Sequence, residues 1–158
     1  TKKGPGPTFY LLHGSMTDRE LVGLYKHPKI RGFVTLTRGE GFGLPILEAA
    51  VTGLPVIATN WSAHTEFLNQ GKFVKIDYTL QAIHESRVDN TIFMPGARWA
   101  QPKEDDTKGK LRKFSKATAL PEIWARSLKQ SLLETHSFKT IETQWHNLFD
   151  RVVLGSEQ

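Results

Sequence analysis

Four short apolar runs alternate with helical patterns over the first half of the chain. Each run has the length of a buried strand, and each ends at a glycine or in a polar turn. Short strands that alternate with helices are typical of a parallel sheet with helices on both faces. The predicted strands are residues 8–13, 32–37, 55–59 and 73–76.

The segments between these runs carry helix start and stop signals. Thr17 and Glu20 have the spacing of a capping box, which predicts a helix before the second strand. A proline at the first helical position, Pro45, and a glycine just past the end, Gly53, bound an apolar helix after that strand. A short helix is predicted over residues 63–69. The pattern therefore supplies a helix for each strand connection.

The second half of the chain has a different pattern. Residues 77–101 read as irregular, and the charged run 102–113 predicts a helix that Gly109 weakens. Apolar positions at helical spacing predict two further helices, one from near Pro121 and one over residues 137–154. We therefore expect one domain spanning residues 1–158. It would have an α/β core over residues 8–80 and a C-terminal helical extension over residues 100–158.

Composition narrows the class of protein without identifying it. A chain of 158 residues with 39% hydrophobic and 23% charged residues is ordinary for a globular domain. It has no cysteine, which excludes disulfides, thiolate catalysis and thiolate metal ligands. No apolar run approaches the roughly 20 residues that span a bilayer, and no signal peptide is visible, so we expect a cytoplasmic location. The net charge of +5 suits a phosphorylated ligand or a nucleic acid.

A glycine-rich turn after the second predicted strand is the strongest candidate site. It lies at the carboxyl end of a parallel strand, where open α/β sheets bind ligands. Its glycines, Gly39, Gly41 and Gly43, allow close backbone approach, and the amides of the next helix suit a phosphate. Glu40 lies in the turn, and Glu48 lies one turn into the helix, placed to accept hydrogen bonds from sugar hydroxyls. From the glycines alone, an ordinary strand-to-helix turn explains the pattern equally well, and neither common phosphate motif is present.

The full string around the turn narrows these alternatives. Residues 38–50 read Arg-Gly-Glu-Gly-Phe-Gly-Leu-Pro-Ile-Leu-Glu-Ala-Ala, and residues 53–59 read Gly-Leu-Pro-Val-Ile-Ala-Thr. Both closely resemble the signature of group 1 glycosyltransferases, which are retaining enzymes of the GT-B fold. That signature has two glutamates separated by seven residues, with Gly-Phe-Gly-Leu-Pro between them. The resemblance covers roughly residues 8–80 and implies a Rossmann-like domain.

The resemblance implies a role for each residue of the turn. The chain would be the C-terminal, nucleotide-sugar-binding domain of an enzyme that transfers a sugar from a nucleoside-diphosphate sugar to an acceptor. Glu48 would bind the ribose hydroxyls, and Glu40, the catalytic candidate, would contact the transferred sugar. The backbone of four residues would hold the sugar and the diphosphate: Gly41, Phe42, Gly43 and Leu44. No cofactor is implied, and no Asp-x-Asp metal motif occurs, so we expect metal-independent binding of the donor.

Departures from the family pattern lead to further expectations. The N-terminal acceptor domain is absent from this sequence, and the basic pair that neutralises the diphosphate is not visible, since Lys2 and Lys3 do not match it. Ser62 and Ala63 stand where many relatives have two glycines. We therefore expect a chain that is incomplete and inactive alone. Its partner would be the missing N-terminal domain, another chain or a second copy in a homodimer.

Three rival functions remain open from the sequence. A nucleotide-sugar epimerase would share the fold, although the Glu-x-Gly-Phe-Gly-Leu-Pro string argues against it. A non-catalytic nucleotide-sugar-binding module is the second rival, and nucleic-acid binding through the basic residues between 108 and 116 is the third. We interpret those basic residues as a solvated helix face and expect no nucleic-acid partner. Trp61 is predicted near the site, whereas Trp99, Trp124 and Trp145 are predicted to pack the helical tail.

Overall fold

A small parallel sheet is the centre of the molecule. The computed structural model describes residues 7–117 and 119–154, so the expectations for Lys2 and Lys3 lie outside the described residues. Three strands pair in parallel in the order β1-β2-β3, with Val34 opposite Ile57 and Ile57 opposite Val74. The strands are β1 (Phe33–Thr35), β2 (Val56–Thr59) and β3 (Val74–Ile76).

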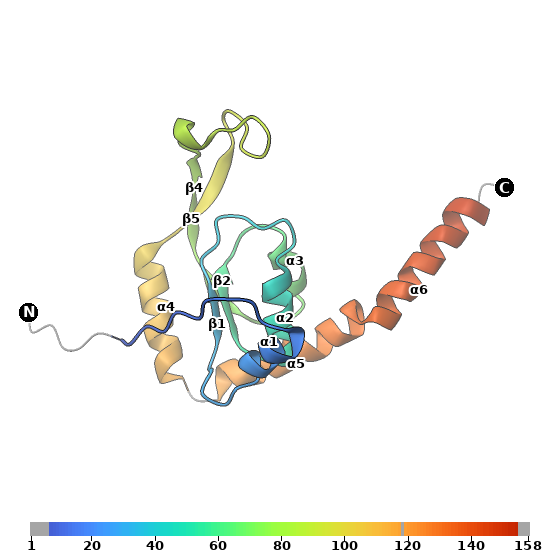
Figure 1. Ribbon diagram of the computed structural model, residues 1–158, viewed down its shortest axis with the longest axis horizontal. Helices are drawn as coiled ribbons and strands as arrows, with labels where there is room; N and C mark the ends of the chain where they lie inside the picture. The colour runs from blue at the N-terminus through green and yellow to red at the C-terminus, as the bar shows by residue number, and fades with distance from the viewer. Residues whose placement is uncertain (1–6, 118, 155–158) are drawn as a thin grey trace, which may run out of the picture.

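Helices flank this sheet, as the sequence pattern predicts. Figure 1 shows α4 on one side of the strands and α2 and α3 on the other, while α5 crosses below them. The capping box of Thr17 and Glu20 is formed, and Gly53 ends α2 with a φ of 86°. The α-helices are α1 (Asp18–Tyr25), α2 (Leu44–Thr52), α3 (His64–Leu68), α4 (Glu104–Lys116), α5 (Leu120–His136) and α6 (Phe138–Phe149).

The core lies between the sheet, α2, α3 and α5. Every residue of β2 is buried, and its alternate side chains, Val56 and Ala58, belong to this core. The other contributors are Ile46, Ala50, Phe67, Leu68, Phe73, Leu128 and Leu132. On α4's side of the sheet, a Cβ added to Gly32 would lie 2.8 Å from the Phe114 ring, so a glycine is needed for that close approach. The α/β fold with a C-terminal helical stretch is therefore confirmed.

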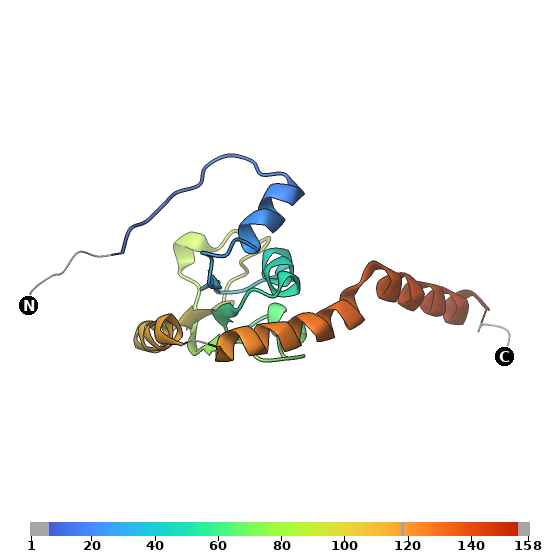
Figure 2. The ribbon, with the colours of Figure 1, turned by 90° about the horizontal axis from the view of Figure 1, so that it is seen from below.

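The first predicted strand is wrong. Residues 8–13 form no strand, and Phe9 and Leu11 are about nine-tenths exposed, at 88% and 90%. Figure 2 shows this segment running outside the body of the molecule towards α1. Apolar composition alone does not make a strand, because a strand is stabilised by pairing with a neighbour, and this segment has none among the described residues. The parallel sheet consequently has three strands rather than four.

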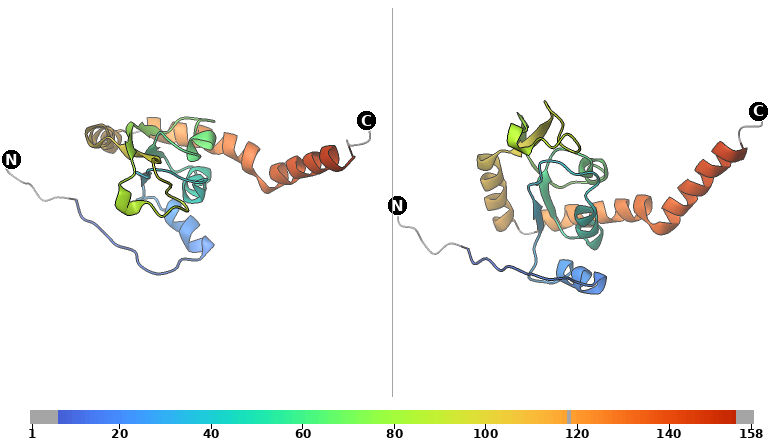
Figure 3. Two further views of the ribbon diagram at one scale, coloured as in Figure 1. Left: turned by 90° about the horizontal axis from the view of Figure 1, so that it is seen from above. Right: turned by 45° about the horizontal axis from the view of Figure 1, so that its top comes forward.

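The prediction of an irregular segment over residues 77–101 is also wrong. Two antiparallel strands, β4 (Tyr78–Ala82) and β5 (Arg98–Pro102), pair along their whole length and project from the body as a ribbon (Figure 3). A short 3₁₀ helix, η1 (Glu85–Arg87), lies in the connection between them. The alternation in β4, with Tyr78, Leu80 and Ala82 on one face, covers only five residues, and β5 has no alternation because Trp99 and Ala100 are adjacent, so the pair was not recognised as a hairpin. We call residues 78–102 the β4–β5 hairpin.

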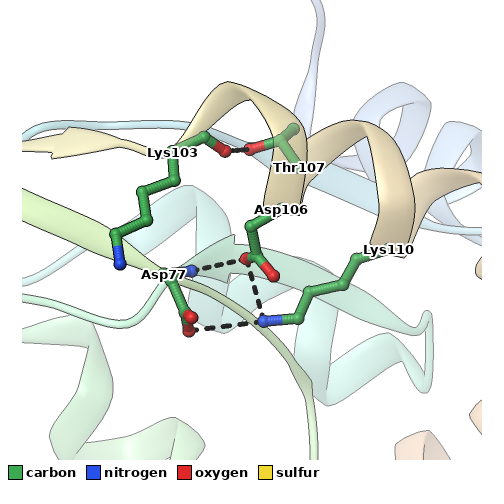
Figure 4. A network of polar contacts seen from close by, with 5 residues as sticks. All are labelled: Asp77, Lys103, Asp106, Thr107 and Lys110. Atoms are coloured by element: carbon green, nitrogen blue, oxygen red, sulfur yellow. Dashed lines mark hydrogen bonds and ion pairs between the residues drawn. The ribbon is translucent and has the colours of Figure 1, made fainter.

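A polar network fixes the start of α4 to the end of the parallel sheet (Figure 4). The Asp106 carboxylate accepts hydrogen bonds from the Asp77 amide and from Lys110 Nζ, both at 2.8 Å. Lys110 Nζ also lies 3.3 Å from Asp77 Oδ1, and the Lys103 amide donates to the Asp77 carbonyl at 2.8 Å. The Thr107 hydroxyl closes the group by donating to the Lys103 carbonyl. Asp77, to which the sequence assigns no role, therefore anchors α4.

The C-terminal helix projects away from the rest of the molecule. Figures 1 and 2 show α6 extending from the end of α5 with little of its surface covered, and a π-helical turn, η2 (Asp150–Leu154), continues it. Trp145 and Phe149 stack on each other, with ring centroids 5.6 Å apart, and both are more than half exposed. Within the described residues, no helix combines the length and apolar character needed to cross a membrane.

Candidate functional site

The glycine-rich turn lies where the sequence places it, at the carboxyl end of β1 and the start of α2. The hydroxyl of Thr37 donates to the Gly39 carbonyl at 2.8 Å, which tightens the start of the turn. Gly43 caps α2 with a φ of 91°, a left-handed conformation that favours glycine. A Cβ at Gly43 would also lie only 3.1 Å from His64 Cβ and 3.2 Å from Ile46 Cδ1. Glycine is therefore needed here for both conformation and space.

A second loop clamps the turn through one serine. Ser62 Oγ accepts a hydrogen bond from the Glu40 amide at 2.9 Å and donates one to the Glu40 carbonyl at 2.7 Å. Ser62 itself has a φ of 85°, a left-handed conformation that costs a non-glycine residue energy. The sequence flagged this position as a departure from a glycine pair but missed the clamp. The glycine pair expected from the family resemblance was the available signal, because glycine is the residue that most readily takes a left-handed conformation.

The two candidate glutamates lie on either side of the start of α2. Glu40 is half-buried within the turn, whereas Glu48 is exposed on α2. Burial raises the pKa of the Tyr25 hydroxyl on α1, and the negative charge of Glu48 raises it further. Glu48 on α2 therefore lies near Tyr25 on α1. Among the described residues, no carboxylate, histidine or cysteine cluster of three or more could hold a metal ion.

The remaining residues of the turn differ in how they are held. Phe42 is 43% exposed, and its ring packs on the buried Phe67 of α3 with centroids 5.5 Å apart. Leu44, the first residue of α2, is 60% exposed. Gly41, Phe42 and Leu44 are exposed, whereas Gly43 is buried. Unpaired amides at a helix start carry partial positive charge.

A buried histidine supports the turn from below. His64 is fully buried, and its Nε2 lies 2.7 Å from the Thr59 carbonyl oxygen. Since a carbonyl only accepts, this hydrogen bond needs a proton on Nε2. In the described part of the chain, His64 Nδ1 and Thr59 Oγ1 are buried side-chain atoms without a protein hydrogen-bond partner. His64 thus contacts both the end of β2, through Thr59, and the start of α2, at Gly43.

Aromatic residues from the β4–β5 hairpin reach the same end of the sheet. The Arg38 guanidinium lies 4.4 Å from the centroid of the Trp99 ring, a cation–π contact. The prediction that Trp99 packs the helical tail is therefore wrong, because β5 carries it to the glycine turn instead. Trp61 does lie beside the site, against Tyr78 at 5.2 Å. Sequence reasoning missed this contribution because it did not predict the hairpin.

The fold and the site together define an α/β domain with a glycine-turn ligand site at the carboxyl edge of a parallel sheet. The family model described as "Glycosyl transferases group 1" matches residues 5–86, just over half of the chain, and this range includes the whole turn, Ser62 and Glu48. The chain belongs to this family of glycosyltransferases. A search of curated proteins and a search of solved structures each found no significant match.

Proposed function

We propose that this domain binds the donor, a nucleoside-diphosphate sugar, and that the enzyme transfers the sugar to an acceptor with retention of configuration. The observation that carries the proposal is the turn of residues 39–43, which Ser62 clamps against the start of α2 inside the family-matched segment. A turn at the start of a helix suits an anionic ligand, because the first amides of the helix point towards it. A group 1 glycosyltransferase uses such a ligand as its donor.

The diphosphate would lie against the backbone of Gly41, Phe42, Gly43 and Leu44. These amides stand at the positive end of the α2 dipole, so they would offset the charge that develops as the glycosidic bond breaks. Because Ser62 fixes the Glu40 peptide through two hydrogen bonds, the donors need little reorganisation during the reaction. These features support a role for the turn in both binding and catalysis.

The two glutamates would recognise hydroxyl groups at the two ends of the donor. Glu48 is exposed on α2 and free to accept hydrogen bonds from the ribose. Glu40, held in the turn, would contact the transferred sugar. In the transfer step, an acceptor hydroxyl oxygen bonds to the anomeric carbon while the bond from that carbon to the diphosphate oxygen breaks. The diphosphate leaves with the electron pair and takes up the hydroxyl proton, and retention means that the new bond forms on the face it leaves.

This arrangement does not call for a divalent cation. The helix dipole and the backbone amides supply positive charge where a metal does so in other transferases. We therefore expect donor binding to persist in EDTA. The expectation that this chain alone transfers no sugar stays a prediction, as does its cytoplasmic location.

A thermal-shift panel tests the proposal. The chain would be melted with UDP, GDP and ADP, with their sugar conjugates, and with EDTA added to each. At least one nucleotide should raise the melting temperature at millimolar concentration, with or without EDTA, because a ligand that binds only the folded state stabilises it. If no nucleotide shifts the melting temperature, the chain does not bind a donor of this class. A shift that EDTA abolishes would contradict metal independence alone.

A further inference from the structure

A second cavity opens beside the glycine turn, under the β4–β5 hairpin. Its volume of about 590 Å³ lies within the usual range for small-ligand sites. Three segments line it: the first half of the turn, the loop after β2, and the hairpin. The turn contributes residues 37–41, the loop contributes Trp61, and the hairpin contributes Ile83, Ile92, Phe93, Ala97, Arg98 and Trp99.

Contacts between side chains hold the walls of this cavity in place. Arg38 and Phe93 both contact Trp99, the guanidinium at 4.4 Å from the ring centroid and the phenyl ring edge-on at 6.0 Å. Trp61, which also lines the cavity, packs against Tyr78. The Ala100 amide donates to the Arg38 carbonyl at 3.1 Å, which joins the hairpin to the turn. The cavity thus has aromatic walls with few charged groups, and Glu40 is one of them.

The position of the cavity separates it from the donor site proposed above. Its lining ends at Gly41, so it lies on the β1 side of the turn rather than at the start of α2. The family match ends at residue 86, before Phe93 and Trp99. The two sites share only the stretch from Glu40 to Gly41. A ligand in the cavity would therefore lie next to the sugar that Glu40 contacts.

We propose that this cavity binds a sugar ring of the acceptor. The apolar C–H face of a pyranose packs on aromatic rings, and its hydroxyls bond to a charged side chain such as Arg98. Adjacency to the transferred sugar is what an acceptor subsite requires, because the reacting atoms must be held close together. The inference that a sugar ring binds here rests on the lining of the cavity. The inference that this ring belongs to the acceptor rests on the proposed donor function.

The four tryptophans make a direct test possible. In a ¹⁵N–¹H spectrum of the whole chain, methyl glycosides of glucose, galactose, mannose and N-acetylglucosamine would be titrated to high millimolar concentration without nucleotide. At least one glycoside should shift the indole N–H signals of Trp61 and Trp99. Trp124 and Trp145 lie outside the cavity and provide internal controls. Equal shifts of all four signals, or none, would overturn the proposal.

Matched variants of the hairpin tip test the walls. Phe93→Ala removes an aromatic wall and should weaken the binding of that glycoside about two- to tenfold. Met94→Ala, a neighbour outside the cavity lining that is 52% exposed, should leave the affinity unchanged. If Phe93→Ala does not fold, Ile92→Ala serves instead, because Ile92 lines the cavity and is 77% exposed. Equal effects of the lining and control variants would contradict the assignment.

A nucleotide titration separates failure of this inference from failure of the donor function. If nucleotides bind and no glycoside shifts Trp61 and Trp99, the donor function stands and the cavity is not a sugar site. If a glycoside shifts both signals and no nucleotide binds, the cavity binds sugar but the donor function is wrong, and its role as acceptor subsite is wrong with it.

Discussion

Ser62 shows how one residue can hold a strained conformation because its side chain is needed. Its φ of 85° would suit glycine, yet glycine has no hydroxyl to bond both backbone groups of Glu40. The hydrogen bonds offset the strain, and the turn is fixed as a result. Strain of this kind is often found at functional sites, where the surrounding structure maintains it.

Two substitutions at Ser62 separate strain from hydrogen bonding. Ser62→Ala keeps the strained backbone and loses both hydrogen bonds, so it should lower the free energy of unfolding by about 1–3 kcal/mol. Ser62→Gly loses the same bonds but relieves the strain, so it should be about 1 kcal/mol more stable than Ser62→Ala. Urea unfolding measures both. If alanine is as stable as wild type, the clamp contributes nothing.

Glu48 tests the ribose contact in the donor site. Because Glu48 is exposed, Glu48→Ala should leave folding unchanged, yet it should weaken nucleotide binding by about 1–3 kcal/mol, the range for hydrogen bonds to a charged group. Calorimetry on both proteins gives the difference. Glu142→Ala, an exposed glutamate on α6, is the matched control and should bind as wild type does. Equal affinities of all three proteins would remove Glu48 from the ribose role.

At the level of residues, the sequence predicts those features that depend only on neighbouring positions. The Thr17–Glu20 capping box follows from neighbours in sequence and is confirmed, and α2 begins at Leu44, one residue before the predicted first position, Pro45. The Ser62–Glu40 clamp joins positions 22 residues apart, and the Arg38–Trp99 contact joins positions farther apart still. No local pattern specifies such pairs, because the fold must form before the side chains meet.

The anchoring of α4 is a property of elements rather than of single residues. Hydrogen bonding to Lys110 and to the Asp77 amide lowers the pKa of Asp106 below its ordinary value of 3.8. A carboxyl whose pKa is lowered by folding stabilises the fold above its unfolded pKa and loses that contribution as the pH falls through the folded value. The contribution of Asp106 is therefore complete at neutral pH and is lost below about pH 4.

The variant Asp106→Ala removes the carboxylate that anchors α4. It should lower the free energy of unfolding by about 0.5–1.5 kcal/mol at neutral pH, since the exposed Asp77 amide loses its protein acceptor and bonds to water instead. The difference from wild type should shrink as the pH falls below about 4. Asp105→Ala, at the adjacent exposed position in the same helix turn, should change stability by less than about 0.5 kcal/mol. A pH-independent difference would show that the ionised carboxylate does not matter.

Two glycines outside the site differ in the space around them. Gly71 tests the packing of α5, and Gly109 is the comparison. A Cβ at Gly71 would lie 2.9 Å from both Cα and Cβ of Leu128, so Gly71→Ala must displace the α5 backbone and should cost about 1–3 kcal/mol. Gly109 lies inside α4 with open space around it, so Gly109→Ala should stabilise the protein by about 0.5–1 kcal/mol. Thermal or urea unfolding compares the two variants. Similar effects would contradict this packing of α5.

Elements were predictable where burial follows a simple pattern. The fully buried β2 and the helices α2 and α5 were recognised from their apolar runs and bounding prolines and glycines. Residues 8–13 were predicted as a strand because they are apolar. They do not pair with β1, which among the described strands pairs only with β2. The β4–β5 hairpin was missed for the opposite reason, since its two short strands have no long apolar run and are recognised only once they pair with each other.

On the scale of the whole molecule, large exposed apolar side chains occur in the segment before α1 and in the C-terminal helical segment. Tyr10 and Leu11 before α1, and Phe138, Trp145 and Val152 along the projecting C-terminal segment, are all more than half exposed. Contiguous exposed apolar surface marks interaction sites in soluble proteins. The β4–β5 hairpin lies at one end of the sheet, and α6 projects away from it (Figure 1).

The central claim is that the glycine turn binds the diphosphate of the donor, and glycine amides test it most directly. In a ¹⁵N–¹H titration with UDP, GDP and ADP, at least one nucleotide should shift the Gly41 and Gly43 signals at millimolar concentration. The signals of Gly23 in α1 and Gly109 in α4 should stay in place, because both lie outside the turn. Unmoved Gly41 and Gly43 signals with all three nucleotides, or equal movement of all four glycines, would contradict the account.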